Sequence, residues 1–152
     1  MNRKKLLVCL AIPLTVGALA ALLSGGGMAA FAALRQPPLS PPGWVFPVVW
    51  TVLYLLMGFA SYLILTSGED NQKALTLYAL QLAVNFLWPI LFFGLGRYGL
   101  AFVCLVLLWV LILATMRQFY NISKLAGDLL LPYLLWVTFA GYLNFAIWML
   151  NS

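Results

Sequence analysis

The sequence contains no histidine and very few charged residues. Its 152 residues include three Asp or Glu and eight Lys or Arg, so 7% of the chain is charged while 65% is hydrophobic. A soluble domain of ordinary composition is about 25% charged and about 45–50% apolar. So few charged side chains cannot cover a globule of this size with a hydrated surface. The composition, with a mean hydropathy of +1.05, predicts that most of the surface faces lipid.

Cysteine is nearly absent as well. Cys9 and Cys104 lie in separate apolar runs, neither of which holds a second thiol. Without histidine, this argues against a disulfide framework and a Cys/His metal site, and favours two small buried hydrophobic residues. The apolar runs also lack carboxylates for proton relay, charged rings for ion selection and any Ser-His-Asp arrangement. The chain therefore lacks the residues on which pumps, ion channels and hydrolases usually depend.

Five long apolar runs alternate with polar and helix-breaking segments. About 20 apolar residues are needed to cross about 30 Å of hydrocarbon as a helix. The first run resembles a secretory signal in its basic start, but it is longer than the usual apolar core of about 7–15 residues. We predict an all-α integral membrane protein, a single domain over 1–152 built as a five-helix bundle. The expected helices are 6–23, 46–66, 74–93, 99–116 and 129–150, with a long loop over 24–45.

The basic residues lie at the ends of these runs. The net charge of +5 is therefore read as a topology signal, and we expect no nucleic-acid partner. With five spans, one side of the membrane carries six basic residues and the other carries only Arg35 and Arg97. This asymmetry predicts that the N-terminus is cytoplasmic. The six are Arg3, Lys4, Lys5, Lys73, Arg117 and Lys124.

Aromatic and amide side chains form stripes at helical spacing on three of the runs. Inside a bilayer, polar side chains turn towards other helices, so such stripes mark the inner faces. Two interpretations remain open: interhelical packing through hydrogen bonds, or an aromatic ligand pocket with a few polar groups. The stripes are Trp50, Tyr54, Gly58 and Tyr62; Gln81, Asn85, Trp88 and Phe92; and Trp136, Ala140, Asn144 and Trp148.

Two prolines fall inside predicted helices. Proline has no N–H for the carbonyl four residues earlier. Pro89 therefore frees the Asn85 carbonyl, and Pro13 frees the Cys9 carbonyl, within the membrane. Such groups need a neighbour, a water or a ligand as partner.

Three segments resemble the signature of the TspO family, the tryptophan-rich sensory proteins related to the mitochondrial translocator protein. They are QPPLSPPGWVFPVVWTVLYLLMG at 36–58, LAVNFLWPILFFG at 82–94 and LPYLLWVTFAGYLNFAIW at 131–148. The resemblance implies a TspO-like bundle, a homodimer, and a pocket beneath the first loop that binds protoporphyrin IX or haem. Many members also bind synthetic benzodiazepine-site ligands.

By matching position, the resemblance places several residues in that pocket. No obligatory cofactor, catalytic residue or metal ligand is implied, and the porphyrin is a ligand. A flat apolar ring system suits stacking on aromatic side chains. The predicted ligand-binding residues, stripe members included, are Phe31, Pro42, Trp50, Tyr54, Asn85, Trp88, Trp136, Ala140 and Asn144.

The first loop departs from the family pattern. Ala30-Phe31 stands where many members carry Trp-Tyr, while Gln36 and Leu39 replace a usual Lys and Trp. Arg35 is the one cation of this loop, and we hypothesise that it meets the porphyrin propionates. No basic residue follows Tyr142, so the sterol motif of animal members is absent.

Three functions fit this resemblance. The first is a membrane receptor or sensor that binds tetrapyrroles; the second is a transporter of porphyrins or other amphipaths; the third is an enzyme that degrades protoporphyrin in light. We expect residence in a bacterial cell membrane, with lipid and an apolar small molecule as partners. Ala79 and Ala83 form a small-residue pair that suits either dimerisation or packing within the bundle.

Overall fold

The chain forms a bundle of long helices. The structure is a computed structural model that describes residues 2–25 and 27–152, and that part of the chain contains no strand. Its elements are α1 (Arg3–Leu23), α2 (Gly27–Ala32), α3 (Val45–Leu65), α4 (Gln72–Pro89), the π-helix η1 (Ile90–Gly94), α5 (Tyr98–Ile122), α6 (Lys124–Leu129) and α7 (Leu131–Leu150).

Five of these segments have the length and composition of membrane spans. They are α1, α3, α4 with η1, α5, and α6 with α7. At a rise of 1.5 Å per residue, a helix of about 20 residues crosses the hydrocarbon core. The predicted five-helix membrane bundle is therefore confirmed.

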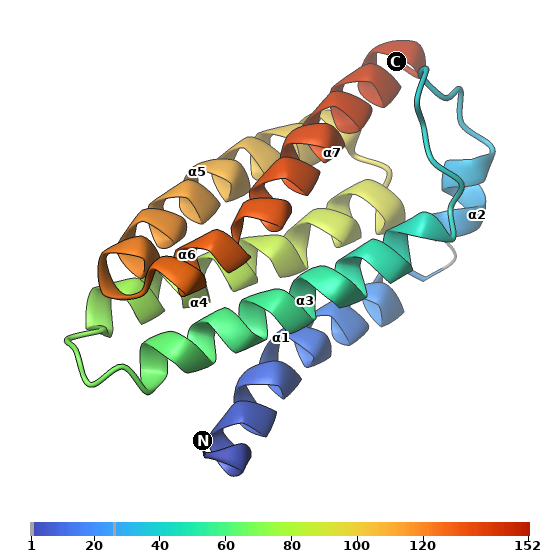
Figure 1. The fold of residues 1–152 in the computed structure, drawn as a ribbon. Helices are drawn as coiled ribbons and strands as arrows, with labels where there is room; N and C mark the ends of the chain where they lie inside the picture. Colours follow the sequence, from blue (N-terminus) through green and yellow to red (C-terminus); the bar gives the residue numbers. More distant parts are fainter. Residues whose placement is uncertain (1, 26) are drawn as a thin grey trace.

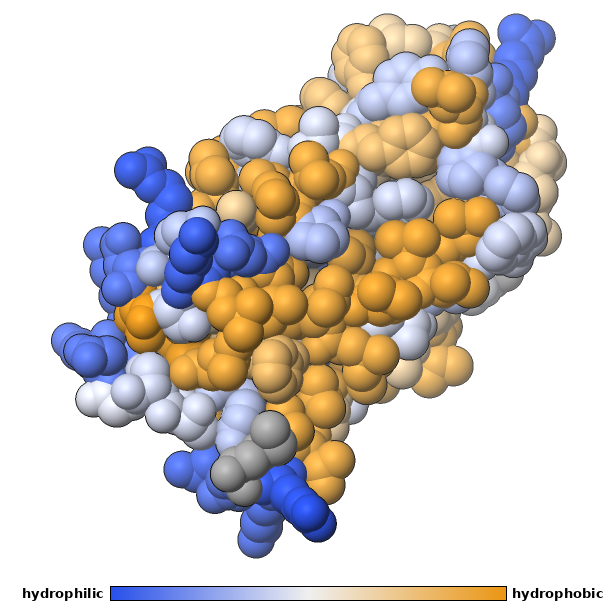
Figure 2. Space-filling view, viewed as in Figure 1, coloured by the Kyte–Doolittle hydropathy of each residue, from blue (hydrophilic) through white to orange (hydrophobic). Residues whose placement is uncertain are grey.

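The long helices lie side by side along one axis (Figure 1). The main contacts join α4 to α5, α1 to α3, and α5 to α7. The N-terminus lies at one end of the bundle, while α2, the loop after it and the C-terminus lie at the other. Figure 2 shows hydrophilic side chains gathered at both ends, with a mainly hydrophobic surface between them. On this face, the molecule has the surface of a protein embedded in lipid.

Two segments expected as connections contain helices. Helix α5 continues six residues beyond the expected end at 116, and α6 follows after Ser123, whose hydroxyl accepts a hydrogen bond from the Ala126 N–H. Arg117 interrupts the apolar run without breaking the helix, because Arg is a good helix former. In the loop 24–45, α2 forms a short helix and brings Phe31 into the core.

Helices α1 and α3 approach closely at two glycines. A Cβ on Gly58 would lie 2.7 Å from the Cys9 carbonyl oxygen and 2.9 Å from the Leu10 Cα. Pro13 deprives that carbonyl of its helical partner, so the backbone of Gly58 packs close to an oxygen that lacks its helical hydrogen bond. Farther along, Gly17 packs on the ring of Tyr54. The two glycines set the distance between these helices.

Substitution of Gly58 by Ala is expected to destabilise the bundle by about 1–3 kcal/mol, because the added methyl forces α1 away from α3. Unfolding in detergent micelles, followed by circular dichroism during titration with dodecyl sulfate, measures this. The matched control is Gly141→Ala on α7, where an added Cβ has no neighbour within 4 Å. Equal stability of the two variants would show that the α1–α3 contact is unimportant.

Candidate functional site

A cavity of about 340 Å³ lies between α1, α3 and α4. This volume is at the lower end of the range of about 300–1,000 Å³ that is common for small-molecule pockets. The lining residues are Leu14, Gly17, Ala18, Ala20, Ala21, Ser24 and Gly25 from α1 and its end; Phe46, Pro47, Trp50, Thr51 and Tyr54 from α3; and Asn85, Trp88, Pro89 and Phe93 from α4 and η1.

Aromatic rings form the inner wall of the cavity. Trp50 stacks on Tyr54, with ring centroids 5.6 Å apart and planes inclined by 28°. Trp88 lies 6.4 Å from Trp50, and its ring stacks on Phe92 at 5.2 Å. The opposite wall, from α1, consists mainly of small residues and leaves space in front of the rings. Such a slot suits a flat, apolar molecule that stacks on the aromatic side.

The mouth of the cavity lies between α1 and α3. Of the lining residues, Ala18, Ala21 and Gly25 on α1 and its end, and Pro47 and Thr51 on α3, are exposed. The neighbouring exposed side chains are apolar and lie on membrane-spanning helices; they are Leu22, Val48 and Val52. The cavity therefore opens sideways, towards the region that lipid chains occupy.

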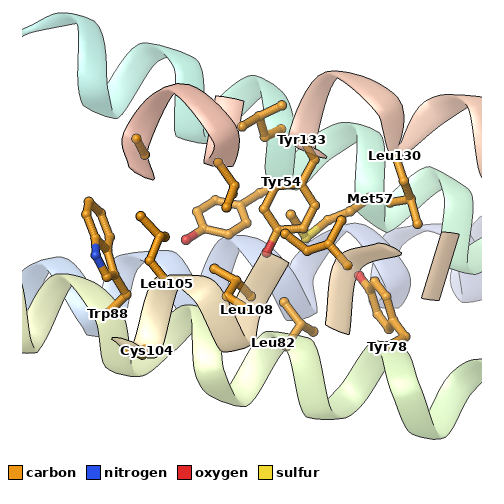
Figure 3. Close-up of a cluster of buried hydrophobic side chains, with 14 of the residues drawn as sticks. Tyr54, Met57, Tyr78, Leu82, Trp88, Cys104, Leu105, Leu108, Leu130 and Tyr133 are labelled. Carbon is orange, nitrogen blue, oxygen red and sulfur yellow. The ribbon is translucent and has the colours of Figure 1, made fainter. Parts of the chain in front are cut away.

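A buried hydrogen-bond network forms the floor of the cavity. The Tyr54 hydroxyl donates to Asn85 Oδ1 at 2.7 Å, and Asn85 Nδ2 donates to the Tyr133 hydroxyl oxygen at 2.7 Å. The Tyr133 hydroxyl donates in turn to Gln81 Oε1 at 2.7 Å. Figure 3 shows the rings of Tyr54 and Tyr133 inside the bundle, between the helices. This network ties α3, α4 and α7 together.

A second network lies closer to the loop end of the bundle. Trp88 Nε1 donates to Asn144 Oδ1 at 2.9 Å, and Asn144 Nδ2 donates to the Tyr98 carbonyl at 2.8 Å. The amides of Asn85 and Asn144 thus serve as interhelical packing groups, the first of the two interpretations of the stripes. Asn85 nevertheless lines the cavity, so packing and pocket coincide at this residue.

Some polar groups have no protein partner. Within the described residues, the buried Trp136 Nε1, Gln81 Nε2 and Tyr78 hydroxyl make no hydrogen bond. Trp50, which lines the cavity, makes no side-chain hydrogen bond within the described residues either. No Asp, Glu, Lys or Arg is among the described lining residues. The cavity is uncharged.

The predicted site residues separate into three groups. Trp50, Tyr54, Asn85 and Trp88 line the main cavity. Phe31, Ala140 and Asn144 surround, with Trp88, a much smaller cavity of about 10 Å³. Pro42 and Trp136 line neither: Pro42 is exposed in the loop, and the Trp136 ring packs against Phe46 at 6.0 Å.

The α1 wall was missed by reasoning from the sequence. Gly17 and Ala21, and likewise Ala20 and Ser24, recur at four-residue spacing, which marks one face of a helix. That spacing was the one sign in the sequence that these residues share a face, but it does not indicate a cavity, because small residues also occur at close helix contacts. Only the position of α1 beside Trp50 and Tyr54 makes them cavity residues.

The loop cation is placed away from the cavity. The Arg35 backbone exchanges hydrogen bonds with the side chain of Asn151, at the C-terminal end of α7. Arg35 does not line the cavity, so the hypothesis that it meets propionates has no support from the cavity wall. Ala79 and Ala83 are exposed on α4, which removes packing within the bundle as the explanation for that pair.

The sequence has clear relatives. Residues 9–149 match the TspO/MBR family. The chain is 41% identical over 138 residues to "Protein CrtK" of Rhodobacter capsulatus, a match that covers 89% of this chain and 85% of the relative. It is 43% identical over 124 residues to "Tryptophan-rich protein TspO" of Chlorobaculum tepidum, covering 80% and 78%. The human "Translocator protein" is 42% identical over 128 residues, covering 82% and 76%.

Removal of the Tyr133 hydroxyl is expected to lower stability by about 1–2 kcal/mol, because Tyr133→Phe takes the acceptor from Asn85 Nδ2 and the donor from Gln81 Oε1 in the membrane interior. The matched control is Tyr142→Phe, which removes an exposed hydroxyl that donates to the Pro38 carbonyl. Unfolding of both variants in detergent micelles provides the comparison. An equal loss of stability in the two variants would mean that the buried network contributes no more to stability than the exposed hydrogen bond does.

Proposed function

Because the chain belongs to the TspO/MBR family, we propose that it is a membrane receptor for tetrapyrroles, protoporphyrin IX or haem, which bind in the cavity between α1, α3 and α4. The observation that carries this proposal is an uncharged, aromatic cavity that opens between two membrane-spanning helices. A flat apolar ring gains from burial and from stacking on Trp50. Benzodiazepine-type ligands, which are smaller and also aromatic, suit the same wall.

The sideways mouth supports entry of the ligand from the bilayer. A hydrophobic porphyrin partitions into lipid, and the rim between Ala21 and Thr51 is the exposed part of the cavity. With no charged residue in the described lining, the propionates are best placed outside the mouth, towards the headgroups. This geometry also favours a second candidate function, the movement of porphyrins or similar amphipaths across or along the membrane. The human relative is named "Translocator protein", which agrees with that alternative.

The membrane orientation and assembly are part of the proposal. We place the chain in a bacterial cell membrane as a homodimer, with the basic N-terminal end in the cytoplasm. The exposed pair Ala79 and Ala83 allows close approach of a second helix. In this orientation, the loop after α2 lies outside the cell.

Cysteine labelling in intact cells is expected to show this orientation. Leu39→Cys, in the exposed loop after α2, should react with a membrane-impermeant maleimide, whereas Glu69→Cys, between α3 and α4, should react only after lysis. The native Cys9 and Cys104 are buried, and the parent protein serves as the blank. The opposite labelling pattern would invert the proposed topology.

Of the two tryptophans that line the cavity, Trp50 is expected to contribute strongly to the affinity for protoporphyrin IX. Trp50→Leu removes the stacking surface, so protoporphyrin IX should bind about tenfold more weakly. Absorbance titration of the purified protein in detergent measures the dissociation constant. Trp109→Leu is the matched control, since Trp109 lies on the outer side of α5 and away from the cavity. The proposal fails if the parent shows no saturable binding, or if both variants bind equally well.

A further inference from the structure

The main cavity and the small cavity share two walls. Phe46 and Trp88 line both of them. The small cavity, with Ala140 and Asn144 on its far side, has only about 10 Å³ of free space. The part of the predicted site around Ala140 and Asn144 is therefore filled with side chains.

Phe31 supplies the ring that fills this region. It is 5% exposed, and its centroid lies 5.2 Å from that of Phe46. It also lies 5.9 Å from Phe92 and 5.5 Å from Phe93. Phe93 lines the main cavity, Phe92 lines the small one, and Phe46 lines both. The Phe31 ring therefore contacts the walls of both cavities.

Gln36 fastens the segment that carries this ring. Its Nε2 donates to the Phe31 carbonyl at 2.7 Å, and its Oε1 accepts from the Ser40 hydroxyl at 2.6 Å. The rest of the loop is tied to α7 by the exchange between Arg35 and Asn151 and by the bond from Tyr142 to Pro38, while Leu34 and Pro37 pack against the bundle. Leu39, at φ +69° and 81% exposed, lies in a backbone region that is unfavourable for a residue with a Cβ. Phe31 and Gln36 lie in this loop and in α2, outside the five membrane-spanning segments, so the Phe31 ring is not part of a spanning helix.

We propose that Phe31, fastened by Gln36, is the residue that selects ligands by size. This inference rests on the proposed function. With the ring seated, the cavity of about 340 Å³ accepts a small planar molecule against Trp50. A tetrapyrrole, with four pyrrole rings in one plane, requires the ring of Phe31 to leave, which joins the two cavities between Phe46 and Trp88.

The energetic consequence is a lower apparent affinity for large ligands only. When the binding-competent state is a minor one, the apparent affinity falls by the fraction of molecules in that state. The seated state is favoured because it buries an aromatic ring among three others. A ligand confined to the main cavity binds without moving Phe31 and is unaffected.

The test compares two ligands on three variants of the purified full-length protein. Protoporphyrin IX is the large probe and diazepam is the small one, and dissociation constants come from absorbance and calorimetric titrations in detergent. We expect Phe31→Ala to bind protoporphyrin IX about tenfold more tightly than the parent and to bind diazepam equally well. Phe102→Ala is the matched control, because Phe102 packs on Phe145 and Trp148, away from both cavities.

Gln36→Ala keeps the Phe31 ring and removes only the side-chain hydrogen bonds to the Phe31 carbonyl and the Ser40 hydroxyl. We expect protoporphyrin IX to associate severalfold faster with this variant in stopped-flow measurements, and this result stands even if Phe31→Ala fails to fold. Unchanged selectivity in Phe31→Ala, or an unchanged association rate in Gln36→Ala, would overturn the inference while parental binding upholds the proposed function. Absence of binding of both probes to the parent would overturn both.

Discussion

The hydrogen-bonded chain that runs from Tyr54 through Asn85 and Tyr133 to Gln81 joins three spanning helices at the floor of the cavity. Between helices in a bilayer, burial of apolar surface gives little net gain, because lipid tails are as apolar as the side chains. Association then depends on close packing and on polar groups whose other choice is an unpaired state in hydrocarbon. The network meets that demand and, at the same time, orients Tyr54 towards the stacked ring of Trp50.

The α1 helix completes the cavity through a different kind of contact. It meets α3 through Gly58 and Gly17, and Gly58 packs close to the carbonyl that Pro13 leaves without a helical partner. Beyond Gly17, the small residues of α1 stand apart from the aromatic wall and leave the cavity open. Close packing and an empty slot thus occur on successive turns of one helix. The site exists because the two helices touch at glycines on one side of it and are separated by a ligand-sized gap on the other.

The interior at the loop end is mainly aromatic, and its cavity has only about 10 Å³ of free space. Phe31, Phe46, Phe92 and Phe93 pack edge to face or tilted, at centroid distances between 4.9 and 5.9 Å. Edge-to-face contacts of this kind are favourable but modest, each about 0.5–1.5 kcal/mol beyond area burial. A planar ligand offers the same rings an equivalent partner. Exchange of one aromatic contact for another is consistent with a binding site for flat molecules and needs no charged group.

The sequence by itself determined the class of the protein and the inner faces of its helices. Hydropathy is a local property, so five runs of about 20 apolar residues sufficed to predict five spans. Helical periodicity is also local, so the stripes through Tyr54, Asn85 and Asn144 were correctly placed inside, as their burial shows. The helical character of 117–122 was missed because hydropathy marks where lipid ends, and a helix can continue beyond it.

Only the tertiary structure decided which of the inner residues meet a cavity. The sequence placed Trp136 and Ala140 beside Trp50, yet the ring of Phe46 packs between Trp136 and the open space, and Phe31 fills the region near Ala140. It gave no role to Gly17 and Ala21, which form the wall opposite Trp50. Periodicity fixes the side of a helix on which a residue lies, whereas a cavity depends on the distances between helices. Those distances follow from contacts distant in sequence, such as Cys9 with Gly58 and Tyr54 with Asn85.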